Sequence, residues 1–200
     1  MRVIAGSLRS RPLRAPKGDA TRPTSDRVRE SLFAIVGDVR GLRVLDLYAG
    51  SGALAIEALS RGAAGAVCVE SSRRALDVIA ENIASLGLGG SVRVIARRVG
   101  DAAKMLAPLG PFDLVLIDPP YADVPSGALA RELRSIVDAA PLGRIFAEGA
   151  LVVVEHASRD EAPKLPGLTH ASTRAWGDTA ASFYDVPMLD GRAAGEGEPT

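Results

Sequence analysis

The chain of 200 residues contains one cysteine, two histidines and few aromatic side chains. With only Cys68 available, no disulfide can form within the chain, which argues against a small secreted fold and for a reducing cytoplasm. His156 and His170 have no ligand-like spacing with other residues, so we assign no metal site. No run reaches the ~20 apolar residues of a membrane span, and the N-terminus lacks the apolar core of a signal peptide. We therefore expect a cytoplasmic protein with no membrane partner.

The formal net charge of the chain is zero, but the charges are unevenly distributed. Residues 1–30 contain eight Lys or Arg and three Asp or Glu, a net charge of +5, so the remaining 170 residues carry −5. A basic arm on an acidic body is the electrostatic pattern of a protein that contacts phosphate groups. The alternative is a solvated basic segment that has no partner.

A strand, a tight turn and a helix are predicted between residues 43 and 59. Residues 43–47 are mostly apolar, residues 48–52 contain Gly50 and Gly52, and residues 53–59 are strong helix formers. This order is typical of the first half of a nucleotide-binding α/β unit, where glycine lets the backbone turn and a ligand approach. The next apolar run, residues 66–69, ends in Glu70, which is well placed to accept hydrogen bonds from ribose hydroxyls. The pattern predicts an adenosine-type cofactor.

The most informative motif is Asp118-Pro119-Pro120-Tyr121, which directly follows an apolar run at residues 114–117. Two consecutive prolines cannot continue a central strand, because neither has an N–H to donate, so the chain must leave the sheet in a rigid turn. Such a turn fixes the carboxylate, turns backbone carbonyls outward and places an aromatic ring beside them. These groups suit a flat ligand that carries an NH2 group, such as a nucleobase. The alternative is a turn that merely ends a strand.

The glycine loop and the Asp118 motif together indicate which cofactor the protein binds. The run from Gly50 to Ala55 fits the G-x-G-x-x-A pattern of dinucleotide-binding loops, so the loop alone does not exclude NAD. A dehydrogenase, however, has no use for an amine-binding turn after the fourth strand. S-adenosylmethionine has an adenine and a ribose but no phosphate, and it delivers a methyl group. With Asp46 before the loop, Glu70 after the second strand and Asp118 after the fourth, the sequence favours a methyltransferase that uses this cofactor.

The chain resembles the bacterial 16S ribosomal RNA guanine-N2 methyltransferases of the RsmD family. The resemblance is carried by residues 2–6, 22–33, 45–54 continuing through 57–63, and 118–121. The cofactor loop is shared by many methyltransferases, whereas residues 22–33 joined to the other motifs are more specific. The similarity spans about residues 1–187; residues 159–167 are weakly patterned, and the tail from Leu189 has no counterpart in the family.

The resemblance implies a Rossmann-like class I S-adenosylmethionine-dependent methyltransferase, an α/β fold with a seven-stranded, mostly parallel sheet and a final antiparallel hairpin. It also implies methylation of N2 of one specific guanine in 16S rRNA, within an assembled or partly assembled small ribosomal subunit. The expected catalytic residues are Asp118, Pro119, Pro120 and Tyr121. The expected cofactor-binding residues are Asp46, Tyr48, Ala49, Gly50, Ser51, Gly52, Glu70, Ser71, Asp101 and Ala102. The expected RNA-binding residues are Arg9, Arg11, Arg14, Arg22, Thr24 and Arg27. For Asp101, a plain helix cap is the alternative role.

We expect three parts: a basic, RNA-binding N-terminal extension over residues 1–38, a methyltransferase domain over residues 39–188, and a disordered tail over residues 189–200. The extension should hold a β-hairpin and a helix that starts at Ser25 or Asp26. That helix should present an apolar face made of Val28, Leu32, Ile35 and Val36. Its residues Arg27 and Arg29 should project away from that face. Later elements are expected as helices at 73–86, 103–106 and 129–137, strands at 92–95 and 150–154, and a hairpin at 168–175 and 182–186.

Three other functions fit parts of the sequence. A different amino methyltransferase, acting on adenine N6 or on a glutamine amide, would use the same Asp118 motif. A nicotinamide-dependent oxidoreductase would use the glycine loop. A non-catalytic RNA-binding assembly factor would keep the fold but lose the chemistry, and the intact Asp118, Gly50 and Glu70 argue against it.

Overall fold

The computed structural model describes residues 1–16 and 25–187. The predicted RNA-binding residues Arg22 and Thr24, and the tail predicted to be disordered, lie outside the described residues. None of the helices in the described part is both long and apolar enough to cross a membrane.

A seven-stranded sheet forms the centre of the molecule, in the order β3-β2-β1-β4-β5-β7-β6. The strands are β1 (Arg43–Leu47), β2 (Gly65–Glu70), β3 (Val92–Ala96), β4 (Phe112–Ile117), β5 (Phe146–Ala157), β6 (Thr169–Trp176) and β7 (Thr179–Asp185). The first five strands pair in parallel, and β7 runs antiparallel between β5 and β6. The predicted mostly parallel sheet with a final antiparallel hairpin is therefore confirmed.

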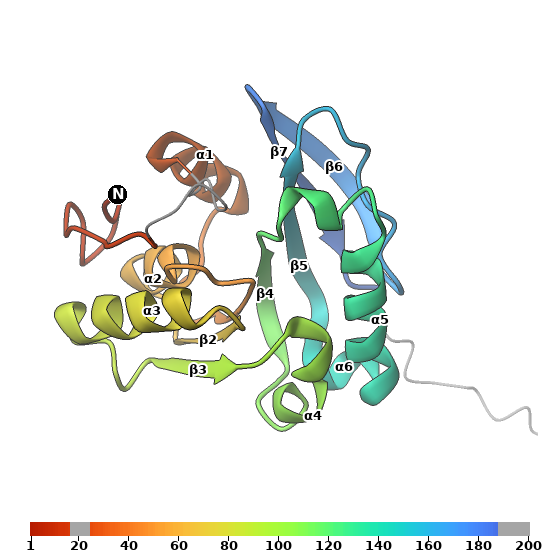
Figure 1. The fold of residues 1–200 in the computed structure, drawn as a ribbon, viewed down its shortest axis with the longest axis horizontal. Coiled ribbons are helices and arrows are strands. Elements are labelled where there is room, and N and C mark those ends of the chain that lie inside the picture. Colours follow the sequence, from red (N-terminus) through yellow and green to blue (C-terminus); the bar gives the residue numbers. More distant parts are fainter. Residues whose placement is uncertain (17–24, 188–200) are drawn as a thin grey trace, which may run out of the picture.

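Helices cover both faces of the sheet (Figure 1). They are α1 (Asp26–Val36), α2 (Ala53–Ser60), α3 (Arg73–Leu86), α4 (Ala103–Leu106), α5 (Ala128–Ala139) and α6 (Leu142–Ile145), with short 3-10 turns at Val99–Asp101 and Tyr121–Asp123. Helices α1, α2 and α3 pack on one face, as Leu32, Ala55 and Ile79 show, and α4, α5 and α6 pack on the other. Because both faces are buried, the central strands are continuous apolar runs rather than alternating ones.

The observed boundaries agree best with the predicted ones in elements that are long enough to repeat their hydrophobic pattern several times. Helix α3 covers the predicted residues 73–86. Strand β5 begins at Phe146, four residues earlier than expected, and helix α6 was not predicted. A helix of four residues is too short to show a periodicity of 3.6, so the pattern carries no signal for it.

The N-terminal segment lies across α2. Val3 N–H donates to the Arg11 carbonyl and Leu13 N–H to the Met1 carbonyl, both at 3.0 Å, so the predicted hairpin is present but reduced to a single antiparallel bridge. Val3 and Leu13 are buried against α2. Gly6 approaches the same helix so closely that a Cβ there would lie 1.7 Å from the Ser60 carbonyl oxygen. The segment is thus fitted to the surface of α2 and is not a free arm.

Helix α1 begins as predicted, with the Ser25 hydroxyl accepting from Val28 N–H at 3.2 Å. Two expectations for this helix are wrong. Ile35 is 45% exposed instead of lying on the buried face, and Arg29 is completely buried instead of projecting into solvent. The Arg29 guanidinium donates to the Arg2 carbonyl at 2.5 Å and to the Asp26 carboxylate at 2.8 Å. It also lies 3.8 Å from the Glu57 carboxylate. Its burial is possible because these oxygens compensate the lost hydration.

Candidate active site

A cavity of about 650 Å³ opens at the carboxyl ends of β1, β2 and β4. In open α/β sheets this edge is where ligands bind. The predicted site residues that line it are Asp46, Tyr48, Ala49, Gly50, Ser51, Glu70, Ser71, Asp118, Pro119, Pro120 and Tyr121. Gly52, Asp101 and Ala102 lie outside this lining. Gly52 caps α2 in a left-handed conformation, Asp101 is exposed in the 3-10 turn, and Ala102 is part of the core.

Glu70 fixes the glycine loop to the end of β2. One carboxylate oxygen accepts from Gly50 N–H at 2.8 Å, and the other accepts from Ser71 and Ser72 N–H, both at 2.7 Å. An ionised carboxylate has about four lone-pair positions, so roughly one remains for a ligand hydroxyl. Glu70 is partly exposed and faces the cavity, which fits the predicted contact with a ribose.

Asp46 lies beneath the loop and is 1% exposed. One of its oxygens accepts from Ala55 N–H at 3.1 Å, while the other, Oδ1, is buried and has no hydrogen-bond partner within residues 1–16 and 25–187. Burial raises the pKa of this carboxyl to about 8, the Ala55 hydrogen bond opposes the shift, and the negative charges of Asp118 and Glu70 add to it. A buried polar atom without a partner in the wall of a cavity suits a ligand that brings a donor or a positive charge, as S-adenosylmethionine does.

A second polar cluster in the cavity was not predicted from the sequence. The Tyr48 hydroxyl donates to Glu132 of α5 at 2.5 Å, and Arg98 donates to the other oxygen of Glu132 at 3.2 Å. Burial and the Glu132 hydrogen bond raise the pKa of Tyr48 well above its usual range. Tyr48 also has a φ of +61°, an unusual conformation for a residue with a Cβ. The cluster links the loop after β1 to the helix on the far side of the cavity.

The Asp118 motif turns away from the sheet as predicted. Asp118 N–H still donates to the Leu47 carbonyl at 3.3 Å, which keeps the residue beside the end of β1. Pro119 is buried and Pro120 is exposed, and the Tyr121 hydroxyl lies 3.0 Å from the Thr179 hydroxyl of β7. The motif therefore lies in the same cavity as the glycine loop, with its aromatic ring anchored by the antiparallel hairpin.

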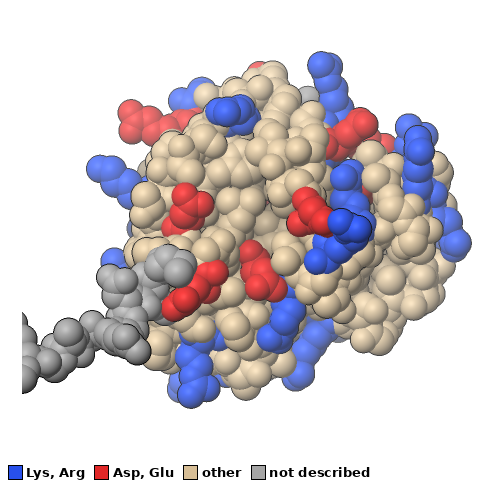
Figure 2. Space-filling model, turned by 180° about the vertical axis from the view of Figure 1, so that it is seen from behind, with Lys and Arg blue, Asp and Glu red and all other residues tan. Residues whose placement is uncertain are grey.

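The predicted RNA-binding arginines that the structure describes are all exposed. Two of them also bind α3: Arg11 donates to the Ser85 carbonyl at 3.2 Å, and Arg14 pairs with Glu81 at 2.9 Å. On the face shown in Figure 2, basic and acidic side chains are interspersed rather than gathered in one basic patch. Met1 and Pro16, at the two ends of the described N-terminal segment, line the cavity itself.

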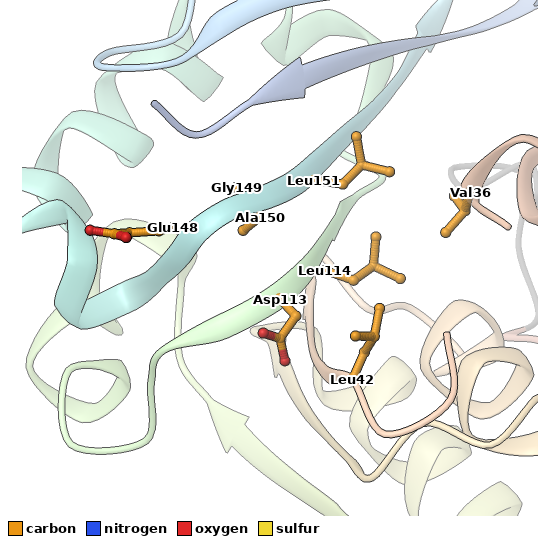
Figure 3. Close-up of a pocket in the computed structure, with 8 residues that line it drawn as sticks. All are labelled: Val36, Leu42, Asp113, Leu114, Glu148, Gly149, Ala150 and Leu151. Atoms are coloured by element: carbon orange, nitrogen blue, oxygen red, sulfur yellow. The ribbon is translucent and has the colours of Figure 1, made fainter. Parts of the chain in front are cut away.

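A second hollow lies near the amino ends of β1 and β4, away from the first cavity (Figure 3). Val36, Leu42, Leu114 and Leu151 give it apolar walls, and Asp113 lies near the start of β4. It contains none of the predicted site residues. Among the described residues, no group of three or more His, Cys, Asp or Glu side chains is placed to hold a metal ion.

The sheet order and the residues at its carboxyl edge define a Rossmann-like class I S-adenosylmethionine-dependent methyltransferase fold. The solved structure of the Escherichia coli protein yhhF matches it with a TM-score of 0.76 at 34% identity, covering 94% of this chain and 99% of that one. A hypothetical protein from Thermus thermophilus matches with a TM-score of 0.73 at 30% identity, covering 92% and 98%.

Sequence comparison places the chain in a family. The model of the family described as "Conserved hypothetical protein 95" matches residues 1–185. The Escherichia coli K12 protein named "Ribosomal RNA small subunit methyltransferase D" is 38% identical over 168 residues, which are 83% of this chain and 79% of that protein. The chain belongs to this family, the RsmD family, as its motifs predicted.

Proposed function

We propose that this protein transfers a methyl group from S-adenosylmethionine to the exocyclic N2 of one specific guanine in 16S rRNA. Methylation of ribosomal RNA is supported by the name of the relative that aligns with most of the chain. The proposal that the methyl acceptor is an amine rests on the position of Asp118-Pro119-Pro120-Tyr121. This motif lies in one cavity with Glu70 and the loop after β1.

In this proposal the residues at the ends of β1 and β2 hold the cofactor. Glu70 would accept a hydrogen bond from the ribose, the Gly50 loop would hold the adenosine and methionine portions, and Asp46 Oδ1 would accept from a donor or positive charge of the cofactor. When bound, S-adenosylmethionine supplies a methyl group already activated by the sulfonium. The protein therefore needs no nucleophile of its own, and its contribution is positioning and electrostatics.

Asp118 and its neighbours orient the acceptor amine. The NH2 group of guanine is a weak nucleophile because its lone pair is delocalised into the ring. Hydrogen bonds from this group to the Asp118 carboxylate and the Pro119 carbonyl would aim the lone pair at the methyl carbon and offset the positive charge that develops on nitrogen. The N–CH3 bond would form as the S–CH3 bond breaks, S-adenosylhomocysteine would leave, and the amine would lose one proton to Asp118 or to water. Tyr121 would stack on the base. A paired base cannot reach the cavity, so the guanosine must be unpaired or flipped out.

The experiment is the transfer of a labelled methyl group to small ribosomal subunits that lack the modification, followed by nucleoside analysis of the RNA. Label in N2-methylguanosine at one site is the expected result. Label in another nucleoside would overturn the guanine assignment while keeping the methyltransferase. Absence of label in the RNA, with the cofactor bound, would overturn the RNA substrate, and DNA and protein would be tested next.

A further inference from the structure

The Asn82 side chain of α3 joins the N-terminal segment to the glycine loop. It is 1% exposed and makes three hydrogen bonds. Its carbonyl oxygen accepts from Arg14 N–H at 2.9 Å, and its amide nitrogen donates to the Arg14 carbonyl at 3.1 Å and to the Ser51 carbonyl at 2.9 Å. Both N–H bonds of the amide are used, so the orientation of this side chain is fixed from two directions.

The two segments that Asn82 joins are both walls of the cavity. Ser51 belongs to the loop predicted to hold the cofactor, and Pro16, two residues after Arg14, lines the cavity from the N-terminal segment. Arg14 is held through its backbone, so its guanidinium stays exposed and pairs with Glu81. A movement of the loop would therefore reach the N-terminal segment through the hydrogen bonds of one buried side chain, in addition to the apolar packing of Ala53 against Val3 and Leu13.

Other contacts hold the N-terminal segment without touching the loop. The Glu57 carboxylate accepts from Ile4 N–H at 2.7 Å and Ala5 N–H at 3.0 Å. The Ser60 hydroxyl accepts from Leu8 N–H at 2.9 Å and donates to the Ala5 carbonyl. These bonds attach the segment to α2, so Asn82 is distinguished from them by its second partner, Ser51.

We propose that Asn82 is a positioning residue that couples the cofactor loop to the RNA-facing N-terminal segment, so that cofactor binding and RNA binding strengthen each other. The inference rests on the proposed function, because it takes RNA as the ligand of that segment. When the loop is ordered by the cofactor, Ser51 holds the Asn82 amide, and the amide holds Arg14 and Pro16 at the cavity wall. Thermodynamic linkage then requires that RNA raise the affinity for the cofactor by the same factor.

The test is the affinity for S-adenosylhomocysteine, which cannot donate a methyl group, with and without small ribosomal subunits that lack the modification. In the unchanged protein we expect the subunits to raise this affinity about fivefold or more. The ratio of the two affinities, with subunits over without subunits, should fall to about one in Asn82→Ala and in Asn82→Asp. Ser60→Ala is the matched control: it loosens the segment without touching Ser51, so it should weaken subunit binding and keep the ratio.

A ratio of one in the unchanged protein, or an unaltered ratio in both Asn82 variants, would overturn the inference. Labelled-methyl transfer by the unchanged protein to the same subunits separates this failure from a failure of the proposed function. If transfer to guanine N2 occurs and the ratio is one, only the coupling is wrong. If the subunits bind but no transfer occurs, the proposed function is wrong, and the ratio still decides the coupling.

A measurement on the unchanged protein covers the case in which the Asn82 variants do not fold. S-adenosylhomocysteine alone should slow hydrogen exchange of the Arg14 amide severalfold, because this amide is held through Asn82 to the loop. The Leu8 amide, held by Ser60, should not change. An equal response of both amides, or no response of either, would overturn the inference.

Discussion

Arg29 of α1 and Glu57 of α2 face each other at 3.8 Å with both side chains fully buried. The same carboxylate accepts from Arg61 at 2.8 Å and from two backbone N–H groups of the N-terminal segment. Helix α1, helix α2 and the N-terminal segment therefore meet at one buried group. The Glu57 carboxylate thus contributes to the position of the segment, together with the bonds that Ser60 and Asn82 make to it.

Removing one partner of this pair should be strongly destabilising. Glu57→Ala leaves the Arg29 charge buried with fewer oxygens around it, and loss of one partner of a buried ion pair costs about 3–5 kcal/mol. Urea unfolding should show this loss for Glu57→Ala and for Arg29→Ala. Arg27→Ala, at an exposed position of the same helix, should change the unfolding free energy by less than about 0.5 kcal/mol. Equal effects at the two arginines would contradict the assigned role of Arg29.

Asp118→Ala should reduce methyl transfer by about 10²–10³-fold, because it removes the charged acceptor that orients the amine and stabilises the developing charge. The dissociation constant for S-adenosylmethionine should stay nearly unchanged. Asp113→Ala, near the other end of β4, is the control and should keep both values. If cofactor binding and transfer fell together in Asp118→Ala, the residue would belong to the cofactor site or to folding.

Reversing the charges of Arg9 and Arg11 should weaken RNA binding about tenfold or more at low salt, with little change in cofactor affinity. Each lost phosphate contact reduces the slope of log affinity against log salt by about 0.7–0.9. Filter binding of 16S rRNA at several salt concentrations measures both quantities. Reversal of Arg134 and Arg159, which are also exposed, gives the same change in net charge and should have a smaller effect. Equal effects would show that only the total charge matters.

Asp46→Asn should change how stability depends on pH. Burial raises the pKa of Asp46 to about 8, above its value in the unfolded chain, so the native state binds an extra proton. The stabilisation from that proton is complete below about pH 4 and is lost as the pH rises to about 8, at no more than about 1.4 kcal/mol per pH unit. Asparagine keeps an acceptor for Ala55 and does not titrate.

The measurement for Asp46→Asn is the free energy of unfolding in urea between pH 4 and pH 9. The free energy of unfolding of the variant should rise relative to that of the unchanged protein between about pH 4 and pH 8, and the difference should level off above about pH 8. Parallel curves for the two proteins would show that Asp46 does not titrate with the raised pKa.

Residue patterns alone predict the central strands, the glycine loop and the Asp118 turn, because each depends on local chemistry, whereas the seven-stranded sheet is implied by the family resemblance. A run of buried strand residues, two glycines around Ser51 and two prolines after Asp118 restrict the backbone without help from distant residues. The start of α1 at Ser25 is local in the same way, since a cap hydroxyl bonds to an amide three residues on.

The rest depends on partners that are far apart in the chain. Arg29 is buried among three partners: Asp26 of the same helix, the Arg2 carbonyl and Glu57. The helical spacing indicates Asp26, whereas the Arg2 carbonyl and Glu57 come from other segments and leave no signal in the pattern. In the sequence, Glu132 has the pattern of an ordinary charged residue on an amphipathic helix. Its partner, the Tyr48 hydroxyl, is 84 residues away in the sequence, so local patterns do not indicate the contact. Charge patterning predicts arginines to be exposed, and it cannot separate one that faces solvent, such as Arg27, from one that is buried, such as Arg29.

The single cysteine has a practical consequence for measuring motion. Cys68 is 1% exposed in the middle of β2, and burial raises the pKa of its thiol well above the usual range. Thiol-directed dyes react with exposed thiolates, so the native cysteine should stay unlabelled while the protein is folded. A cysteine introduced at position 9, with a second at exposed position 134, would therefore carry a dye pair without any change to the native thiol. Fluorescence energy transfer between the two dyes would follow the N-terminal segment directly.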